Sequence, residues 1–375
     1  MPWPVAGSAG RLAAVWYGTS DGTHNPSSDD NHQAWDVYLS LVSAASTRCS
    51  GRLRTSRGNG DGGARDVLRA PVCCAPSWGP LREVHVRRVR SIRPSTFSIV
   101  AVDPEAGEAG VAVQSKFLAA GAVVPWARGG TGAVATQAFA EVTFGVRGLD
   151  LLEQGMSPQE ALDRLLDGDS ERETRQVGIV DMAGRSASFT GAECFEWAGG
   201  VTGDGYCCQG NILAGEAVVA GMAEAFERTS GRALARRLVE ALRAGQAAGG
   251  DRRGQEASGL IVARPGGGYG GNHDRYIDLR VDHHDEPIEQ LARLLDLHRL
   301  YFEKSPDAEI VDADQGLQRE IREHLERLGR IGPDADLWNA LSDYMGWENL
   351  EERWVGPGKV DPKVLEYLRS HAARA

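Results

Sequence analysis

Positive charge is scarce in this chain of 375 residues, in which 41 Lys and Arg face 52 Asp and Glu for a net charge of -11. Proteins that follow a phosphate backbone cluster cations on their surface, so the composition argues against nucleic acid as a partner. The sequence also lacks an apolar run of about 18 residues that could span a bilayer. No basic segment followed by an apolar one opens the chain, so we expect a cytoplasmic protein without a membrane partner.

The sequence also lacks the cysteine spacing that is typical of metal sites. The six cysteines lack the paired C-x-x-C pattern of a zinc site, which favours reduced thiols; they are Cys49, Cys73, Cys74, Cys194, Cys207 and Cys208. A group of His and Asp residues between His273 and Asp285 fits a solvated charged edge better than a metal site. The glycine run 266–271 lacks the Lys-Ser/Thr of a phosphate loop. We therefore expect neither a metal nor a cofactor.

Residues 1–94 show no sustained period of two or of 3.6 residues, so we predict a low-order extension there. The segment contains no lysine and no methionine after Met1, as expected of upstream DNA read in frame. Val86 and Val89 are alternative first residues, because a GTG start codon is recorded as Val when the start is placed too early. We expect residues 1 to about 88 not to belong to the natural protein.

From residue 95 to 303 the pattern predicts an α+β domain. Strand pairs and helices follow one another without the alternation of βαβ units, which disfavours a parallel sheet. We predict a four-layer αββα sandwich, with two sheets between helical layers. The predicted strands are 96–102, 110–115, 132–137, 176–181, 186–190, 258–263 and 276–281, and the predicted helices are two split at Ser157-Pro158, two within 216–245 split near Ser230-Gly231, and 287–302.

A polar linker, residues 304–314, precedes three apolar stripes at helical spacing. Leu317, Ile321 and Leu325 belong to the first, Leu337 and Leu341 to the second, and Val364, Leu365 and Leu368 to the third. We predict a small three-helix domain over residues 315–375.

Several motifs carry a family resemblance. TFSIVA (96–101), SKFLAAGAVVPWA (115–127), GAVATQA (132–138), GAECFEWA (191–198), QGNILAG (209–215) and AAGGDRRG (247–254) together resemble the DUF1028 family, which is placed in the N-terminal-nucleophile (Ntn) hydrolase superfamily. LERLG (325–329) and MGWENLEERW (345–354) are similar to a peptidoglycan-binding domain. The resemblance implies an Ntn-type fold for residues 96–302.

The resemblance also implies a mechanism in which the first residue of the mature chain attacks an amide while its α-amine takes the proton. An α-amine has a pKa near 8, close to working pH, whereas a lone hydroxyl is a poor nucleophile. Thr96 matches the nucleophile, which in family members follows the initiator Met, and Ser95 and Ser98 are weaker alternatives. Here Thr96 is internal, so a free amine requires cleavage after Ser95.

Six further residues are site candidates. Lys116, the only lysine before residue 304, is expected to act beside the nucleophile, and Asp103 is either catalytic or a turn cap. Gln209 and Asn211 are candidate amide donors to an oxyanion, and Asp251 and Arg252 are candidates to bind substrate, the Arg by holding a carboxylate. Gly200 stands where the family commonly has His.

Two functions follow. The first is hydrolysis of a small amide or peptide bond, conceivably in a cell-wall fragment, through an acyl-enzyme on Thr96. The second is a binding protein for a small ligand or peptidoglycan that keeps the fold without catalysis. The enzyme needs Thr96 at a free terminus and the binding protein does not. The sequence leaves a homo-oligomer open.

Overall fold

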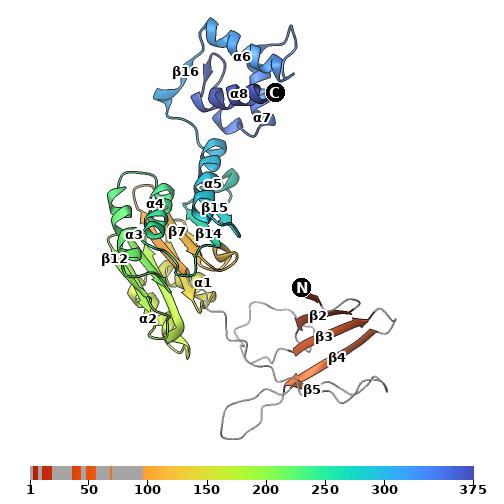
Figure 1. Cartoon of the computed structure of the whole chain (residues 1–375). Coiled ribbons are helices and arrows are strands. Elements are labelled where there is room, and N and C mark those ends of the chain that lie inside the picture. The colour runs from red at the N-terminus through yellow and green to blue at the C-terminus, as the bar shows by residue number, and fades with distance from the viewer. Residues whose placement is uncertain (1–2, 7–10, 19–35, 44–47, 56–67, 70–95) are drawn as a thin grey trace. The chain divides into compact units, whose positions relative to one another are not determined.

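A computed structural model describes residues 3–6, 11–18, 36–43, 48–55, 68–69 and 96–375 (Figure 1). The chain divides into two compact units, Met1–Ile92 and Arg93–Ala375. No sheet that the structure describes includes strands of both units.

The first unit contains a five-stranded antiparallel sheet in the order β1-β2-β3-β4-β5, in the segment that we predicted to be a low-order extension. Its strands are β1 Trp3–Ala6, β2 Arg11–Gly18, β3 Asp36–Ser43, β4 Arg48–Thr55 and β5 Leu68–Arg69. Apolar residues at Val37, Leu39 and Leu41 give β3 a short period of two, too brief to stand out in a Gly- and Ser-rich segment. The natural start of the chain stays a prediction.

The second unit is built on a six-stranded sheet in the order β12-β13-β6-β7-β14-β15, with every neighbouring pair antiparallel. The strands are β6 Thr96–Asp103, β7 Glu108–Ser115, β12 Gly199–Gly203, β13 Tyr206–Asn211, β14 Ala257–Ala263 and β15 Arg275–Val281. The predicted hairpin of β6 and β7 is confirmed, and Thr96 opens an inner strand as predicted. β12 was not predicted as a strand, whereas Cys207 and Cys208 were expected to lie in a buried strand and belong to β13.

A second, four-stranded antiparallel sheet has the order β11-β10-β9-β8. Its strands are β8 Pro125–Arg128, β9 Gly132–Ala138, β10 Arg175–Asp181 and β11 Ser186–Thr190. The predicted second hairpin is β10 and β11. β8 was missed because it is short and begins with Pro.

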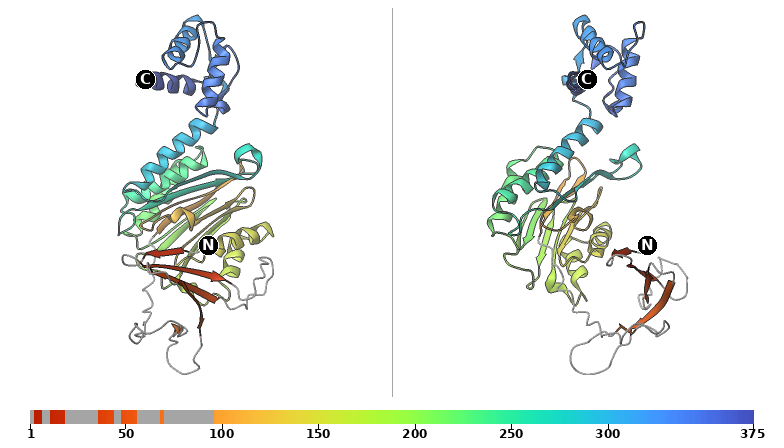
Figure 2. Two further views of the ribbon diagram at one scale, coloured as in Figure 1. Left: turned by 90° about the vertical axis from the view of Figure 1, so that its right-hand side faces the viewer. Right: turned by 45° about the vertical axis from the view of Figure 1, so that its right-hand side comes forward.

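Three apolar clusters hold the sheets and helices together. Val100, Val111 and Val113 of the six-stranded sheet pack against Ala133 and Val180 of the four-stranded sheet. α3, α4 and α5 cover the other face of the six-stranded sheet, and α1 and α2 cover the four-stranded one (Figure 2). The helices are α1 Thr143–Glu153, α2 Pro158–Leu166, α3 Ala217–Arg228, α4 Leu234–Ala247 and α5 Pro287–Phe302. The protein is a mixed α and β structure with antiparallel sheets.

Residues 315–375, called here the C-terminal module, hold three further helices, so the described chain has eight. These are α6 Gln315–Arg327, α7 Leu337–Trp347 and α8 Pro362–Arg374. The predicted apolar stripes form its core, and Leu300 and Tyr301 from the end of α5 are partly buried and pack against it. β16 Val311–Asp312, in the segment predicted to be a linker, pairs with β17 Lys359–Val360. Among the described helices, none has both the length and the apolar composition needed to cross a bilayer.

Candidate functional site

One end of the six-stranded sheet gathers most of the predicted site residues. Thr96, the first residue of β6, pairs with Asn211 at the end of β13 and with Ser115 at the end of β7. Ser115 in turn pairs with Ala257, the first residue of β14. The ends of four neighbouring strands therefore lie in one row, and the loops that follow them meet there.

Thr96 lies on the face of β6 that is turned toward the four-stranded sheet. Side chains alternate along a strand, and Val100 on the same face packs between the sheets. Thr96 is 1% exposed, and its Oγ1 lies 3.1 Å from Ser115 Oγ, within hydrogen-bond distance. Ser115 was not predicted as a site residue, since only the register of β6 on β7 places it beside Thr96.

Buried polar side chains fill the space between the sheets next to Thr96. Gln209 Nε2 donates to Ser98 Oγ at 2.6 Å, and Ser98 donates to Gln137 Oε1 at 2.6 Å. Gln137 Nε2 and Asn211 Nδ2 both donate to Gln176 Oε1, each at 2.9 Å. We call these five residues the amide layer. Each is at most 2% exposed, so the layer is part of the protein interior.

The amide layer changes the interpretation of Gln209 and Asn211. Their amide nitrogens, predicted to face a ligand, donate to protein oxygens. A side-chain carbon at Gly178 would lie 2.2 Å from Gln209 Oε1, so glycine there makes room for the layer. Gln137 and Gln176 were missed, although a glutamine within an apolar strand pattern is the signal that could have found them.

Lys116 follows β7 directly, but its ammonium is engaged by Glu256. Lys116 Nζ donates to Glu256 Oε2 at 2.8 Å and to the carbonyl of Gln255 at 2.9 Å. His283 Nδ1 contacts the other oxygen of Glu256. Hydrogen bonds from Lys116 and then His283 hold the pKa of Glu256 below its usual value. Lys116 thus belongs to a Lys-Glu-His cluster at the same end of the sheet.

Asp251 and Arg252 have different environments. The Asp251 side chain is fully buried and accepts from the backbone nitrogens of Lys116, at 3.0 Å, and Arg253, at 2.8 Å. It therefore fastens the loop before β14 to the end of β7. Arg252 is exposed, and its guanidinium donates to the carbonyl of Glu196 at 3.3 Å.

Asp103 lies at the opposite end of β6 from Thr96, about 23 Å away for an eight-residue strand. Its Oδ1 accepts from the nitrogen of Ala106 at 3.1 Å. The structure thus does not bring Asp103 to the Thr96 end, and its contact is that of a turn cap.

The remaining candidates are separate from this site. Burial raises the pKa of the Cys207 and Cys208 thiols, which makes them poor nucleophiles. His273 and His284 accept hydrogen bonds from nearby backbone nitrogens. Within the described residues, no group of three or more His, Cys, Asp or Glu side chains is arranged to hold a metal ion.

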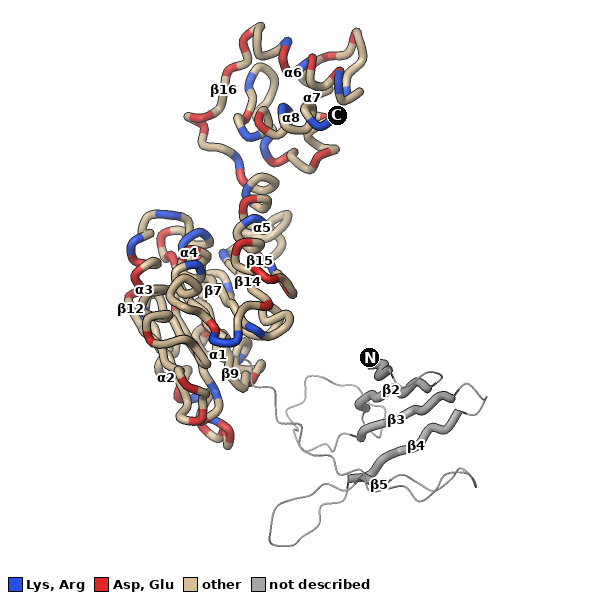
Figure 3. The backbone as a smooth tube through the Cα atoms, viewed as in Figure 1, with Lys and Arg blue, Asp and Glu red and all other residues tan. Residues whose placement is uncertain are grey.

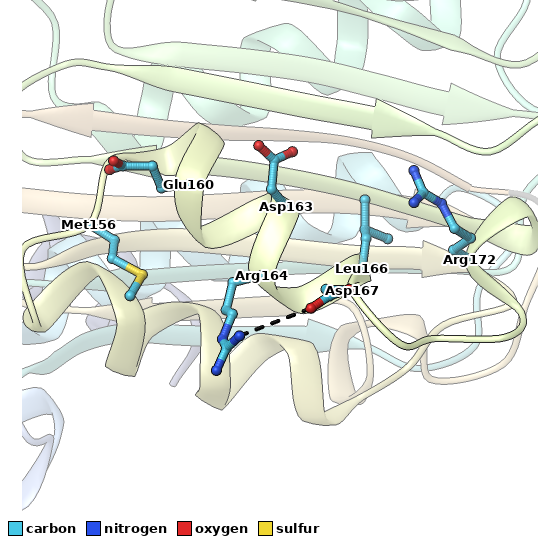
Figure 4. Close-up of a pocket in the computed structure, with 7 residues that line it drawn as sticks. All are labelled: Met156, Glu160, Asp163, Arg164, Leu166, Asp167 and Arg172. Carbon is cyan, nitrogen blue, oxygen red and sulfur yellow. Dashed lines mark ion pairs between the residues drawn. The ribbon is translucent and has the colours of Figure 1, made fainter.

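An open pocket on the surface of α2 also lies away from Thr96 (Figure 4). It is lined by Met156, Glu160, Asp163, Arg164, Leu166, Asp167 and Arg172. None of these belongs to the row of strand ends, and Arg164 and Asp167 pair with each other at 4.0 Å. Along residues 96–375, Lys and Arg positions are interspersed with Asp and Glu positions (Figure 3).

Comparison with known proteins identifies two regions. Residues 301–368 match the model of a domain family to which peptidoglycan binding is ascribed. A crystal structure of a DUF1028 protein from Silicibacter pomeroyi is similar, with 32% sequence identity and a TM-score of 0.50, over 57% of this chain and 91% of that one. No curated protein matches the chain. Residues 96–291, more than half of the chain, match the model of DUF1028, a family of unknown function, and the chain therefore belongs to the DUF1028 family.

Proposed function

We propose that residues 96–302 are an amide hydrolase of the Ntn type, with Thr96 as the nucleophile. In this proposal the two sheets and their helices form a four-layer αββα sandwich. The observation that carries it is the position of Thr96, which opens an inner strand with its hydroxyl within hydrogen-bond distance of Ser115.

The proposed reaction has two steps. Thr96 Oγ1 attacks the carbonyl carbon of the substrate amide while the free α-amine of Thr96 takes the hydroxyl proton. The carbon–nitrogen bond then breaks, and the ammonium gives the proton to the leaving nitrogen. Water cleaves the resulting ester in the same way, which releases the acid and restores Thr96.

The structure supports a part in the proposed reaction better for some neighbours of Thr96 than for others. Ser115 is in contact with Thr96 Oγ1 and would orient it. Asn211 pairs directly with Thr96 across the sheet, but its Nδ2 donates to Gln176 Oε1, so it would meet an oxyanion only by giving up that contact. The exposed guanidinium of Arg252 suits a substrate carboxylate. Lys116 would act with its charge partly neutralised by Glu256.

We propose a muropeptide or similar cell-wall fragment as substrate, acted on in the cytoplasm. The match of residues 301–368 to a peptidoglycan-binding family supports this choice. Such a domain would hold one part of a fragment while the Thr96 site acts on an amide bond.

The test compares two N-termini. In the 375-residue chain the nitrogen of Thr96 is a peptide nitrogen and cannot act as the base. A fusion whose leader is cleaved to leave Thr96 first supplies the free amine. We expect only this form to hydrolyse members of a library of amides, γ-glutamyl compounds and muropeptides, and to gain the mass of an acyl group on Thr96.

Variants of the Thr96-initiated form identify the nucleophile. Thr96→Ala should lose at least about a thousandfold in rate, whereas Thr96→Ser should keep part of it, because a hydroxyl remains. Thr202→Ala is the matched control, since Thr202 lies exposed on β12. Equal rates for Thr96→Ala and the parent would sink the mechanism.

The second candidate is a binding protein without catalysis. It is favoured by the internal position of Thr96 and its 1% exposure. Binding of a library compound by both N-terminal forms, without turnover by either, would establish this function in place of hydrolysis.

A further inference from the structure

The C-terminal module carries an unusually exposed tryptophan. Trp347, the last residue of α7, is 68% exposed. A large aromatic ring gains free energy when it is covered, and tryptophan, with an apolar ring and an N–H donor, is enriched at interfaces. The core of the module is complete without this ring, so packing does not explain it.

Arg330 lies over this ring, with its Cζ 4.3 Å from the ring centroid. Gly329, with a φ of 65°, follows the C-cap residue of α6, and the nitrogen of Arg330 donates to the carbonyl of Leu325 at 2.8 Å. The backbone of Arg330 is therefore fixed by the helix end. Trp347 comes from a different helix, so the fold itself brings the guanidinium and the indole together.

The surrounding charges leave Arg330 available. The carboxylate of Glu348, next to Trp347, accepts from Tyr367 Oη at 2.9 Å and lies 3.8 Å from His371 Nδ1. Arg330 forms no ion pair within the part of the chain that the structure describes. Arg330 covers part of the indole, which remains largely exposed, and a guanidinium without an ion pair on such a ring suits a ligand that combines a sugar ring with a carboxylate.

We propose that Trp347 and Arg330 are the ligand contact of the module, and that the ligand is a muropeptide. The sugar ring stacks on the indole, and the guanidinium binds the carboxylate at the end of the peptide. This inference rests on the proposed peptidoglycan partner and names the residues that recognise it.

The test uses the full chain and two soluble probes, a disaccharide tetrapeptide and the same compound with its carboxylates amidated. Trp347→Ala should weaken binding of the first probe about tenfold, and Trp347→Phe should weaken it less. Arg330→Ala should weaken binding of the acid probe about tenfold and leave binding of the amidated probe unchanged. Isothermal titration calorimetry measures each affinity.

Two controls match these changes. Tyr269→Ala removes an 80% exposed ring outside the module, and Arg327→Ala removes an exposed arginine of α6. Both should bind like the wild type, and unchanged thermal unfolding should accompany every variant, because the altered side chains lie at the surface. If the wild type binds and the Trp347 and Arg330 variants bind equally well, the assignment is wrong and peptidoglycan binding stands. If the wild type binds neither probe at millimolar concentration, both the assignment of Trp347 and Arg330 and the proposed peptidoglycan binding are wrong.

Discussion

At the scale of single residues, the side chain of Gln176 links the two sheets by hydrogen bonds. Its Oε1 accepts from Gln137 and Asn211, and its Nε2 donates to Thr190 Oγ1 and to the carbonyls of Gly199 and Gly210. A buried donor that loses its acceptor costs about 1–3 kcal/mol, more than the net gain of an average hydrogen bond. Loss of a partner within the amide layer should therefore lower the stability of the protein.

Gln176→Leu should lower the free energy of unfolding by about 3 kcal/mol, because it leaves the amides of Gln137 and Asn211 without their acceptor. Urea unfolding followed by circular dichroism measures the change. Gln159→Leu on the exposed face of α2 is the control and should stay within about 0.5 kcal/mol of the wild type. A Gln176→Leu variant as stable as the control would show that the layer contributes nothing to stability.

Residue identities near the site were only partly predictable. Thr96, Asn211 and the loop of Asp251 do meet at one end of the sheet. Asp103 does not, since a strand places its two ends far apart. The partners Ser115 and Glu256 depend on strand register, which a single sequence does not specify.

At the scale of elements, local patterns predicted well where they were strong. Ser157 begins α2 as expected, since its hydroxyl accepts from the nitrogen of Glu160 while Glu160 binds back to the nitrogen of Ser157. The sequence pattern did not predict β12, because Gly199, Gly200 and Gly203 give no apolar alternation. A side-chain carbon at Gly200 would also lie 2.9 Å from the carbonyl of Cys208, so the His common in the family would need its neighbours to shift.

Ser157→Ala should destabilise the protein by about 1 kcal/mol, the usual cost of losing a helix N-cap. The same urea titration detects it. Ser170→Ala, an exposed serine in the turn after α2, should have no measurable effect. Equal stability of the two variants would mean that the start of α2 does not depend on its cap.

At the scale of the whole molecule, Arg353 ties α5 to the C-terminal module. Its guanidinium donates to the carbonyls of Arg299 and Leu300, at the end of α5, and to Asp361 Oδ2 at 2.8 Å. The side chains of Arg353 and Asp361 are 5% and 0% exposed. Removal of one partner from a buried pair leaves a charge without compensation, which costs about 3–5 kcal/mol.

Arg353→Ala should therefore increase hydrogen–deuterium exchange throughout α6, α7 and α8. Lys363→Ala, which breaks an exposed pair with Glu366, is the control and should leave exchange almost unchanged. Wild-type exchange in the Arg353 variant would argue against this role.

Low pH should also loosen the C-terminal module, because protonation of Asp361 removes its charge from the pair with Arg353. Burial alone raises the pKa of Asp361, but hydrogen bonds from Ser305 and Lys363 and the charge of Arg353 outweigh it, so the net pKa is lowered. A lowered pKa in the folded state stabilises the module above the ordinary aspartate value of about 4, and this contribution is lost as the pH falls through the lowered value. Circular dichroism against pH should show the module unfolding only below about pH 4.

The end of α5 has a consequence for how such proteins are assembled from genes. Leu300 and Tyr301 are partly buried and pack against the core of the C-terminal module, while Ile288 and Leu291 of the same helix belong to the core beneath α3 and α4. A recombination point placed after Phe302 would remove the two side chains that pack against the core of the module and would leave Arg353 without two acceptors. The heritable unit is therefore the module together with the last turn of α5, and a transplant to another protein has to carry that turn with it.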